Sequence, residues 1–286
     1  METYRPNITD KYHIQESLGE GATAEVYKAD EVASGRSVAL KIYNFDYPIQ
    51  DQMHEAEMLA QIVGCPNTVQ LVEFAPYAEN PYIATTYHEG NTLRTILDVS
   101  ETMYPYQGAQ LLSDVATGVG AVHKKGIVHG DIKPANIQVD SDNSPTMIDF
   151  GHAIGVRIGE TYHQDSVFTT PQYMSPERIH KQCSHTCDVY STGVVGYEIF
   201  TGKNPFEDEF ENDILLKQLR LPPPSFERLL GSEMDKSLDP FEEVILKAVA
   251  KDTRDRHADM DELRDALQEG LANSLKITAK DLVIIG

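Results

Sequence analysis

The residues best suited to chemistry lie in two short runs, HGDIKPAN at positions 129–136 and DFG at positions 149–151. The first run offers a carboxylate at Asp131 and an ammonium at Lys133. Phosphoryl transfer asks a protein for metal ligands, a positioned acceptor and positive charge near the moving group. Asp131 could orient an acceptor hydroxyl and take its proton, while Lys133 could contact the phosphoryl group that is transferred.

The same two runs contain side chains that could bind a metal ion. Asn136 and Asp149 supply oxygen ligands of the kind that Mg²⁺ prefers. Each run alone would occur by chance in many proteins. The two runs in this order are a strong signal for phosphoryl transfer.

A glycine-rich segment upstream could hold phosphates. The run LGEGATAEV at 18–26 predicts a strand, a turn containing Gly19 and Gly21, and a second strand. Glycine lets the backbone approach a phosphate closely because it has no Cβ atom. A Gly-x-Gly pair is weak evidence by itself, because most such pairs form ordinary hairpin turns.

Lys41 lies in the middle of an apolar run, VALKI at 38–42. An edge-strand lysine that reaches water is one interpretation. The burial of an unpaired ammonium is costly, so the pattern favours a lysine that bridges nucleotide phosphates and a helix carboxylate. Glu55 fits this partner, because it precedes Leu59 by one turn on the apolar face of the helix predicted at 53–62.

These ordered motifs resemble a eukaryotic-type (Hanks-type) serine/threonine protein kinase. The resemblance covers residues 12–268 and continues in the runs TPQYMSPE at 170–177 and DVYSTG at 188–193. These runs resemble the end of an activation segment and the start of the central buried helix of the large lobe. A late RDR run resembles the family's arginine motif, and by this resemblance its Arg256 should pair with Glu177.

The resemblance implies an α+β protein with the bilobal protein kinase-like fold. Residues 12–88 would form a small lobe with an antiparallel sheet and one main helix, and residues 89–272 a larger, mostly helical lobe. Residues 1–11 would be an N-terminal extension. Residues 273–286 form an apolar tail, which we expect to pack against the large lobe. Capture of a partner, or edge-strand pairing with a second chain, is the alternative for this tail.

The same resemblance assigns roles to individual residues. It implies ATP as the phosphoryl donor, Mg²⁺ as the cofactor and protein substrates as acceptors. The catalytic residues would be Asp131, Lys133, Lys41, Glu55 and Thr170, and the metal ligands Asn136 and Asp149. The nucleotide would lie against Leu18, Gly19, Gly21, Val26, Ala39, Lys41, Thr85, Thr86 and His88. Thr85 falls at the gatekeeper position, and the backbone groups of Thr86 and His88 would bind the purine edge.

Gln138 departs from the family pattern beneath the adenine, where an apolar residue is usual. A buried glutamine needs hydrogen-bond partners. Either the register slips locally, so that Ile137 or Val139 forms the floor, or this pocket is wetter than is usual in the family.

Gly130 is a second departure, because the family commonly has an arginine there. In kinases that have it, this arginine binds a phosphate on the activation loop. Since Gly130 has no side chain, we predict that activity does not require a phosphate on this segment. The hydroxyls concerned are Ser166, Thr161 and Thr169. Arg157 or Arg178 could substitute as the cation.

Other groups could hold the active arrangement instead. Leu59, Leu71, His129 and Phe150 match the stack of side chains that aligns the two lobes in the family. Asp188 could brace the backbone at His129 and Gly130.

Two rival functions belong to different classes. Small-molecule kinases of the aminoglycoside and choline type often have His-Gly-Asp in their catalytic loop, as this chain does. Lys133, Pro134 and the stretch 169–177, which resembles a peptide-docking segment, argue against them. A pseudokinase would be a binding module that lost the chemistry, and it would be expected to lack Lys41, Asp131 or Asp149.

Composition narrows the possible partners. The chain has 286 residues, of which 24 are Lys or Arg and 45 are Asp or Glu, so its formal charge is -21. The electrostatic field of this negative charge repels nucleic acids and anionic membranes, and it favours basic protein substrates. Three cysteines and the lack of a signal peptide or of an apolar run near ~18 residues predict a cytoplasmic protein without a membrane anchor. The oligomeric state does not follow from the sequence.

Overall fold

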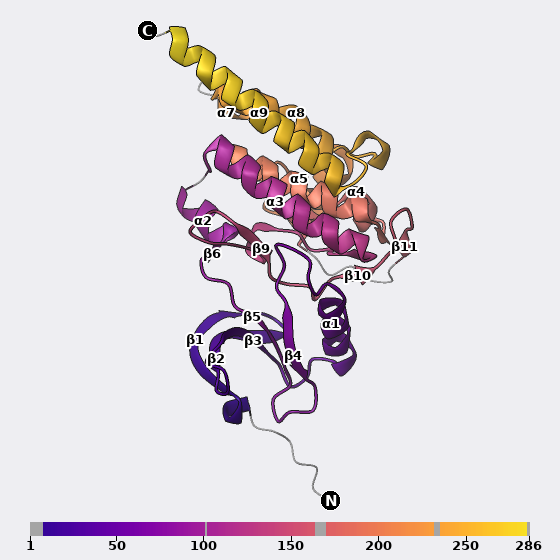
Figure 1. Ribbon diagram of the computed structural model, residues 1–286. Helices are drawn as coiled ribbons and strands as arrows, with labels where there is room; N and C mark the ends of the chain where they lie inside the picture. Colours follow the sequence, from indigo (N-terminus) through magenta and orange to yellow (C-terminus); the bar gives the residue numbers. More distant parts are fainter. Residues whose placement is uncertain (1–7, 101, 164–169, 232–234, 285–286) are drawn as a thin grey trace, which may run out of the picture.

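A computed structural model describes residues 8–100, 102–163, 170–231 and 235–284, with side chains described up to residue 274. It has two lobes (Figure 1), as the resemblance predicts. The N-terminal lobe is a five-stranded antiparallel sheet in the order β1-β2-β3-β5-β4, with one helix beside it. Its elements are β1 (Tyr12–Glu20), β2 (Ala24–Glu31), β3 (Ser37–Tyr43), α1 (Ile49–Gln61), β4 (Leu71–Ala75) and β5 (Tyr82–Thr86).

The C-terminal lobe is mostly helical. Its helices are α2 (Leu93–Ser100), α3 (Pro105–Lys124), α4 (Pro176–Ile179), α5 (His185–Thr201), α6 (Glu211–Arg220), α7 (Phe226–Leu230), α8 (Asp239–Ala248) and α9 (Met260–Ile284). Short strands lie near the lobe boundary and the activation segment: β6 (Asn91–Thr92), β7 (Ile127–Val128), β8 (Ile137–Val139), β9 (Pro145–Met147), β10 (Ile154–Gly155), β11 (Tyr162–His163) and β12 (Gln182–Cys183). The fold is therefore α+β, as predicted.

Alternation along β3 separates a core face from a face that is open to the other lobe. Val38 and Leu40 are fully buried within the sheet's own apolar cluster. Successive side chains of a strand point to opposite faces, so Ala39 and Lys41 lie on the other side. The antiparallel register places Val26 opposite Lys41 and Thr85 opposite Ala39. The sheet thus gathers these four side chains on one face.

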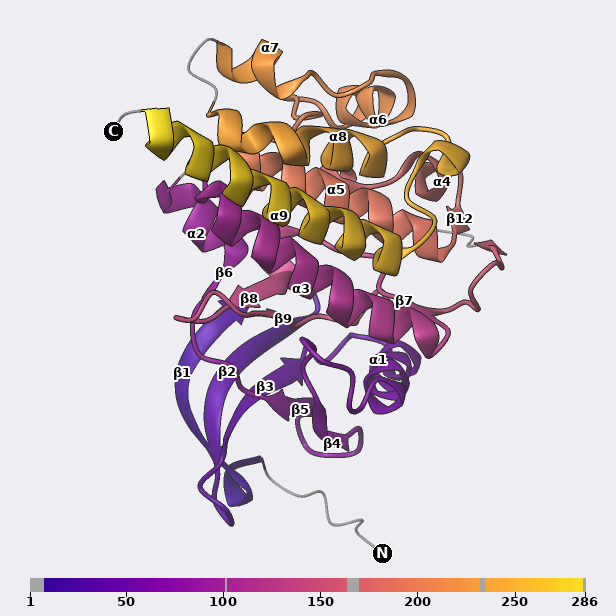
Figure 2. The same cartoon turned by 45° about the horizontal axis from the view of Figure 1, so that its top comes forward.

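Two helices form the centre of the large lobe. Helix α3 buries Leu111, Leu112, Val115, Val119 and Val122, which recur at the helical spacing of three and four residues. Helix α5 is buried from Cys187 to Thr201 and begins at His185, earlier than the DVYSTG run suggests. Figure 2 shows α9 lying across α3 and α8.

Both ends of the described chain form regular structure: a 3₁₀ helix at Ile8–Asp10 and the end of α9. Ile8 is buried against the sheet, and the ammonium of Lys11 lies 2.6 Å from the Glu73 carboxylate. At the other end, α9 continues without a break to Ile284. The stretch from Asn273 to Ile284 is therefore helical and is not an edge strand in this structure. No helix in the described residues is long and apolar enough to cross a membrane.

Candidate active site

A cavity of about 530 Å³ lies between the two lobes, within the size range of small-molecule sites. Every residue predicted to contact the nucleotide lines it: Leu18, Gly19, Gly21, Val26, Ala39, Lys41, Thr85, Thr86 and His88. Glu55, Asn136 and Asp149 line it as well. Asp131, Lys133 and Thr170 are not among its lining residues and meet one another beside it.

The expected ion pair between Lys41 and Glu55 is present. Lys41 Nζ donates to Glu55 Oε1 at 2.7 Å and to Oε2 at 2.8 Å, and it lies 3.6 Å from Asp149 Oδ1. Burial lowers the pKa of Lys41, but the charges of Asp149 and Glu55 outweigh it and raise this pKa above its usual value. Lys41 is therefore a fixed cation at the inner end of the cavity.

Tyr43 also holds Glu55, which the sequence analysis did not anticipate. Tyr43 is buried, and its hydroxyl donates to Glu55 Oε2 at 2.9 Å. Burial and the Glu55 carboxylate raise the pKa of the Tyr43 phenol far above its usual value, so it remains a donor. Its position two residues after Lys41 on the same strand face was the available signal.

Asp131, Lys133 and Thr170 form a connected chain of polar contacts. Lys133 Nζ lies 2.7 Å from Asp131 Oδ2 and donates to Thr170 Oγ1 at 2.9 Å. The amide of Asn136 donates to the backbone oxygen of Asp131 at 2.8 Å and to its Oδ2 at 3.0 Å. A short 3₁₀ turn at Pro134–Asn136 brings that amide back toward Asp131. The predicted catalytic residues of the C-terminal lobe therefore lie together.

Asn136 and Asp149 fit a magnesium site completed by phosphates. Burial raises the pKa of Asp149, but Lys41 and the N–H of Gly151 outweigh it and lower it to about 2. Since the amide nitrogen of Asn136 donates to Asp131, its carbonyl oxygen is the atom left to face a cation. Among the described residues, no group of three or more His, Cys, Asp or Glu side chains forms a metal cage. Mg²⁺ commonly binds through one or two carboxylates together with substrate phosphates.

Asp188 binds the backbone of the catalytic loop and also contacts a buried histidine of α3. Asp188 accepts hydrogen bonds from the N–H groups of His129 at 2.8 Å and Gly130 at 2.9 Å, as expected. It also lies 2.8 Å from His123 Nε2, a partner that sequence reasoning missed. The His129 ring packs on Phe150 with 4.7 Å between ring centroids. Phe150 shares the apolar core with Leu59, and Leu71 packs against that core.

Gln138 itself lines the cavity, which decides against a local slip of the register. In β8, Ile137 and Val139 are buried in the core, whereas Gln138 lines the cavity. The register does not slip, because alternation along the strand turns only the middle residue toward the cavity. Ile148 lines the cavity as its apolar counterpart.

At the hinge, one of the backbone groups predicted to bind the purine already has a partner, and the side chains contact one another. The His88 ring lies 3.0 Å from Thr86 Oγ1 and 3.3 Å from Thr146 Oγ1, so it links β5 to β9. Burial lowers the pKa of His88. The N–H of Thr86 donates to the carbonyl of Gln70 at 2.9 Å and is not left for a ligand.

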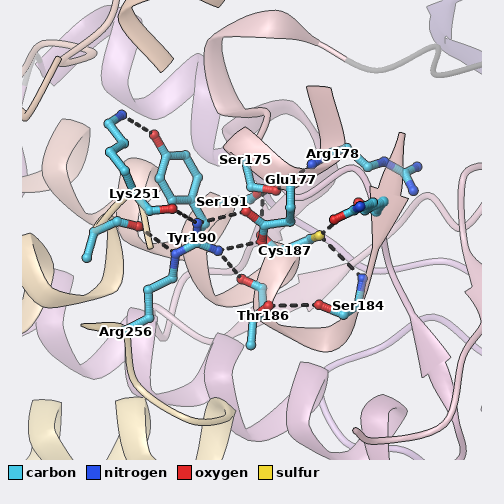
Figure 3. A network of polar contacts seen from close by, with 12 residues as sticks. Ser175, Glu177, Arg178, Ser184, Thr186, Cys187, Tyr190, Ser191, Lys251 and Arg256 are labelled. Carbon is cyan, nitrogen blue, oxygen red and sulfur yellow. Dashed lines mark hydrogen bonds and ion pairs between the residues drawn. The ribbon is translucent and has the colours of Figure 1, made fainter. Parts of the chain in front are cut away.

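Arg256 and Glu177 form the predicted ion pair. Arg256 Nη1 and Nη2 lie 2.5 and 2.8 Å from the two carboxylate oxygens of Glu177. Arg256 also donates to the backbone oxygens of Ala250, Thr186 and Lys251. Figure 3 shows this pair within a wider polar network around α5. The pair fixes α4, and with it the end of the segment that carries Thr170.

Comparison with known proteins agrees with this arrangement. The chain matches the protein kinase domain family over residues 12–268. It is 31% identical over 256 residues to the serine/threonine-protein kinase PrkC of Bacillus subtilis, covering 87% of this chain and 39% of that protein. It is also 31% identical over 274 residues to PknB of Mycobacterium leprae (92% and 43%) and 31% identical over 281 residues to Pkn1 of Myxococcus xanthus (94% and 39%). The chain spans about two fifths of the length of these relatives. It belongs to the Hanks-type serine/threonine protein kinase family.

Proposed function

We propose that this protein transfers the γ-phosphoryl group of ATP to serine and threonine hydroxyls of protein substrates. The observation that carries the proposal is the contact of Lys133 with both Asp131 and Thr170 beside a nucleotide-sized cavity. Thr170 belongs to the segment that leads to α4, where a peptide acceptor would dock. This link between a catalytic carboxylate and a hydroxyl of that segment supports a protein substrate over a small molecule.

The roles proposed for the side chains follow from their places. Asp131 would accept the hydroxyl proton, and Lys133 would place positive charge beside the transferred group. Lys41, held by Glu55 and Tyr43, would orient the donor phosphates. Bound Mg²⁺, held by Asn136 and Asp149, would neutralise phosphate charge.

The proposed setting is the cytoplasm, with basic proteins as favoured substrates. All three cysteines are free and buried, which suits a reducing compartment. The formal charge of -21 would draw basic partners toward the protein.

A transfer assay with three acceptors tests the function. The purified protein, labelled ATP and Mg²⁺ are incubated with a basic protein, an acidic protein, or a mixture of an aminoglycoside and choline. We expect label on serine and threonine of the basic protein, detected by phosphoamino acid analysis, and none with the Asp131→Asn variant. Label confined to the small molecules would assign the rival kinase class. ATP binding by calorimetry without transfer to any acceptor would indicate a pseudokinase.

We further propose that catalysis does not require a phosphate on the activation segment. The support is Gly130, which offers no cationic side chain. Thr161 is exposed, while Ser166 and Thr169 lie outside the described residues. A phosphate bound by an arginine at position 130 would stabilise the segment by one charge-assisted contact, which contributes ~1.5–3 kcal/mol.

Phosphatase treatment tests this independence directly. The enzyme is dephosphorylated, mass spectrometry confirms that the segment is bare, and kcat/KM is measured on a fixed peptide. We expect a change of less than about threefold. A loss beyond ~10-fold, which corresponds to about 1.4 kcal/mol of transition-state stabilisation, would show that a phosphate is needed.

A further inference from the structure

Arg178 is a buried cation to which the proposed mechanism gives no role. It lies on α4 and is 3% exposed. Its Nε and Nη1 atoms have no hydrogen-bond partner within the part of the chain that the structure describes. The burial of an unpaired charge is costly, so the position of this guanidinium needs a physical reason.

The guanidinium lies beside Gly130, the residue that replaces the usual arginine. A Cβ atom built on Gly130 would lie 3.2 Å from Arg178 Nη2 and 2.8 Å from the carbonyl oxygen of His152. Gly130 also has a φ of 77°, in the left-handed region that favours glycine. A side chain is therefore excluded at position 130, and Arg178 occupies part of the space that it would enter.

The surroundings of Arg178 suit an internal cation and not a phosphate receptor. Arg178, Asp131 and Asp188 line one small cavity with a volume of about 10 Å³. This volume admits about one water molecule, so a phosphate group does not fit. Two carboxylates around the same space attract the guanidinium charge. Their presence also disfavours an anion there.

Two consecutive residues of helix α4 extend toward different parts of the lobe. The Glu177 carboxylate is bound by Arg256, at 2.5 and 2.8 Å. Arg178 extends away from Arg256, as Figure 3 shows, and reaches the catalytic loop at Gly130. The N–H of Arg178 donates to Ser175 Oγ, which caps this single helical turn. One turn of helix thus joins the arginine motif near α9 to the loop that carries Asp131.

We propose that Arg178 is a positioning residue that ties α4 to the catalytic loop and stands in for the missing loop arginine. The positive charge then comes from α4 instead of from the catalytic loop itself. It is present without any modification, so the alignment of Asp131, Lys133 and Thr170 needs no phosphate. The catalytic consequence rests on the proposed function, whereas the structural tie does not.

Kinetics of phosphatase-treated enzyme test the catalytic consequence. Arg178→Gln removes the charge and keeps a shorter, polar side chain. We expect kcat per nucleotide-binding site to fall by at least 10-fold, with KM for ATP within about threefold, because Arg178 does not line the nucleotide cavity. Arg228→Gln, at an exposed arginine of α7, is the matched control and should keep full kcat. A kcat for Arg178→Gln within threefold of the parent would overturn the catalytic role.

Hydrogen–deuterium exchange tests the tie without any need for activity. In Arg178→Gln, the amides of 129–131, 175 and 177–179 should exchange at least 10-fold faster, while those of β3 should stay unchanged. Unchanged exchange in the catalytic loop would refute the tie. If the parent protein itself has no kinase activity, the result counts against the proposed function. Failure of the proposed function and failure of the tie are therefore distinguishable.

A variant that retains the charge keeps the proposal testable even if Arg178→Gln folds poorly. Arg178→Lys keeps a cation on a long side chain in the space beside Gly130. If the charge at this place aligns the catalytic loop, Arg178→Lys should keep kcat within about threefold of the parent. A loss of 10-fold or more in Arg178→Lys, with an unchanged Tm, would show that the charge does not have this role.

Discussion

Replacing Asp131 with asparagine is expected to lower kcat for peptide phosphorylation by ~10²–10⁴-fold, the usual loss when a general base is removed. The asparagine oxygen can still accept hydrogen bonds from Lys133 Nζ and Asn136 Nδ2, which now contact Asp131 Oδ2. It cannot take a proton from the acceptor hydroxyl. The variant therefore separates proton transfer from the architecture of the loop.

Folding and nucleotide binding should survive this change. Asp131 is not among the residues that line the nucleotide cavity, so the affinity for ATP by calorimetry and the Tm should stay close to those of the parent. Asp213→Asn, at an exposed carboxylate of α6, is the matched control. Activity of the Asp131 variant within a few-fold of the parent would remove Asp131 from its catalytic role.

Lys41→Met and Asp149→Ala are each expected to reduce turnover by on the order of 100-fold or more, since both remove charge that acts on the phosphates. Methionine has a similar length to lysine but leaves the buried Glu55 with only the Tyr43 hydroxyl of its two present donors. We therefore also expect a lower Tm for Lys41→Met. Asp149→Ala removes the carboxylate that is ionised at neutral pH because its pKa is lowered to about 2.

The two variants should differ in their response to magnesium. Calorimetric titration of ATP with and without Mg²⁺ should show that the metal strengthens binding to the parent and to Lys41→Met, but not to Asp149→Ala. Asp142→Ala, at an exposed carboxylate of the same lobe, should behave as the parent does. If Asp149→Ala keeps the full magnesium effect, Asp149 is not the metal ligand.

The sequence alone predicted most of the site, because its decisive groups are closely spaced along the chain. Asp131, Lys133 and Asn136 lie within one loop, and five residues of chain cannot separate them far in space. Lys41 was recognisable because an ammonium in an apolar strand needs a partner. Helical periodicity then pointed to Glu55, and their contact at 2.7 Å is present.

Features that depend on the direction of a side chain could be predicted from the sequence only in part. Alternation along β8 could have been applied to Gln138, but whether the strand keeps its register depends on its pairing with β6 and β9. That pairing places Ile137 and Val139 in the core and turns Gln138 toward the cavity. The tail from Asn273 is apolar in sequence, yet only the folded chain shows that it continues α9.

Residues distant in sequence required the tertiary structure. The His123–Asp188 contact, the place of His88 between β5 and β9, and the position of Arg178 beside Gly130 join segments that no local pattern relates. Gly130 read alone indicates a missing cation. Only the fold shows that α4 brings a guanidinium to the same place. The physical reason is that burial and charge compensation depend on which segments pack together. Packing in turn depends on the whole chain and not on any local pattern.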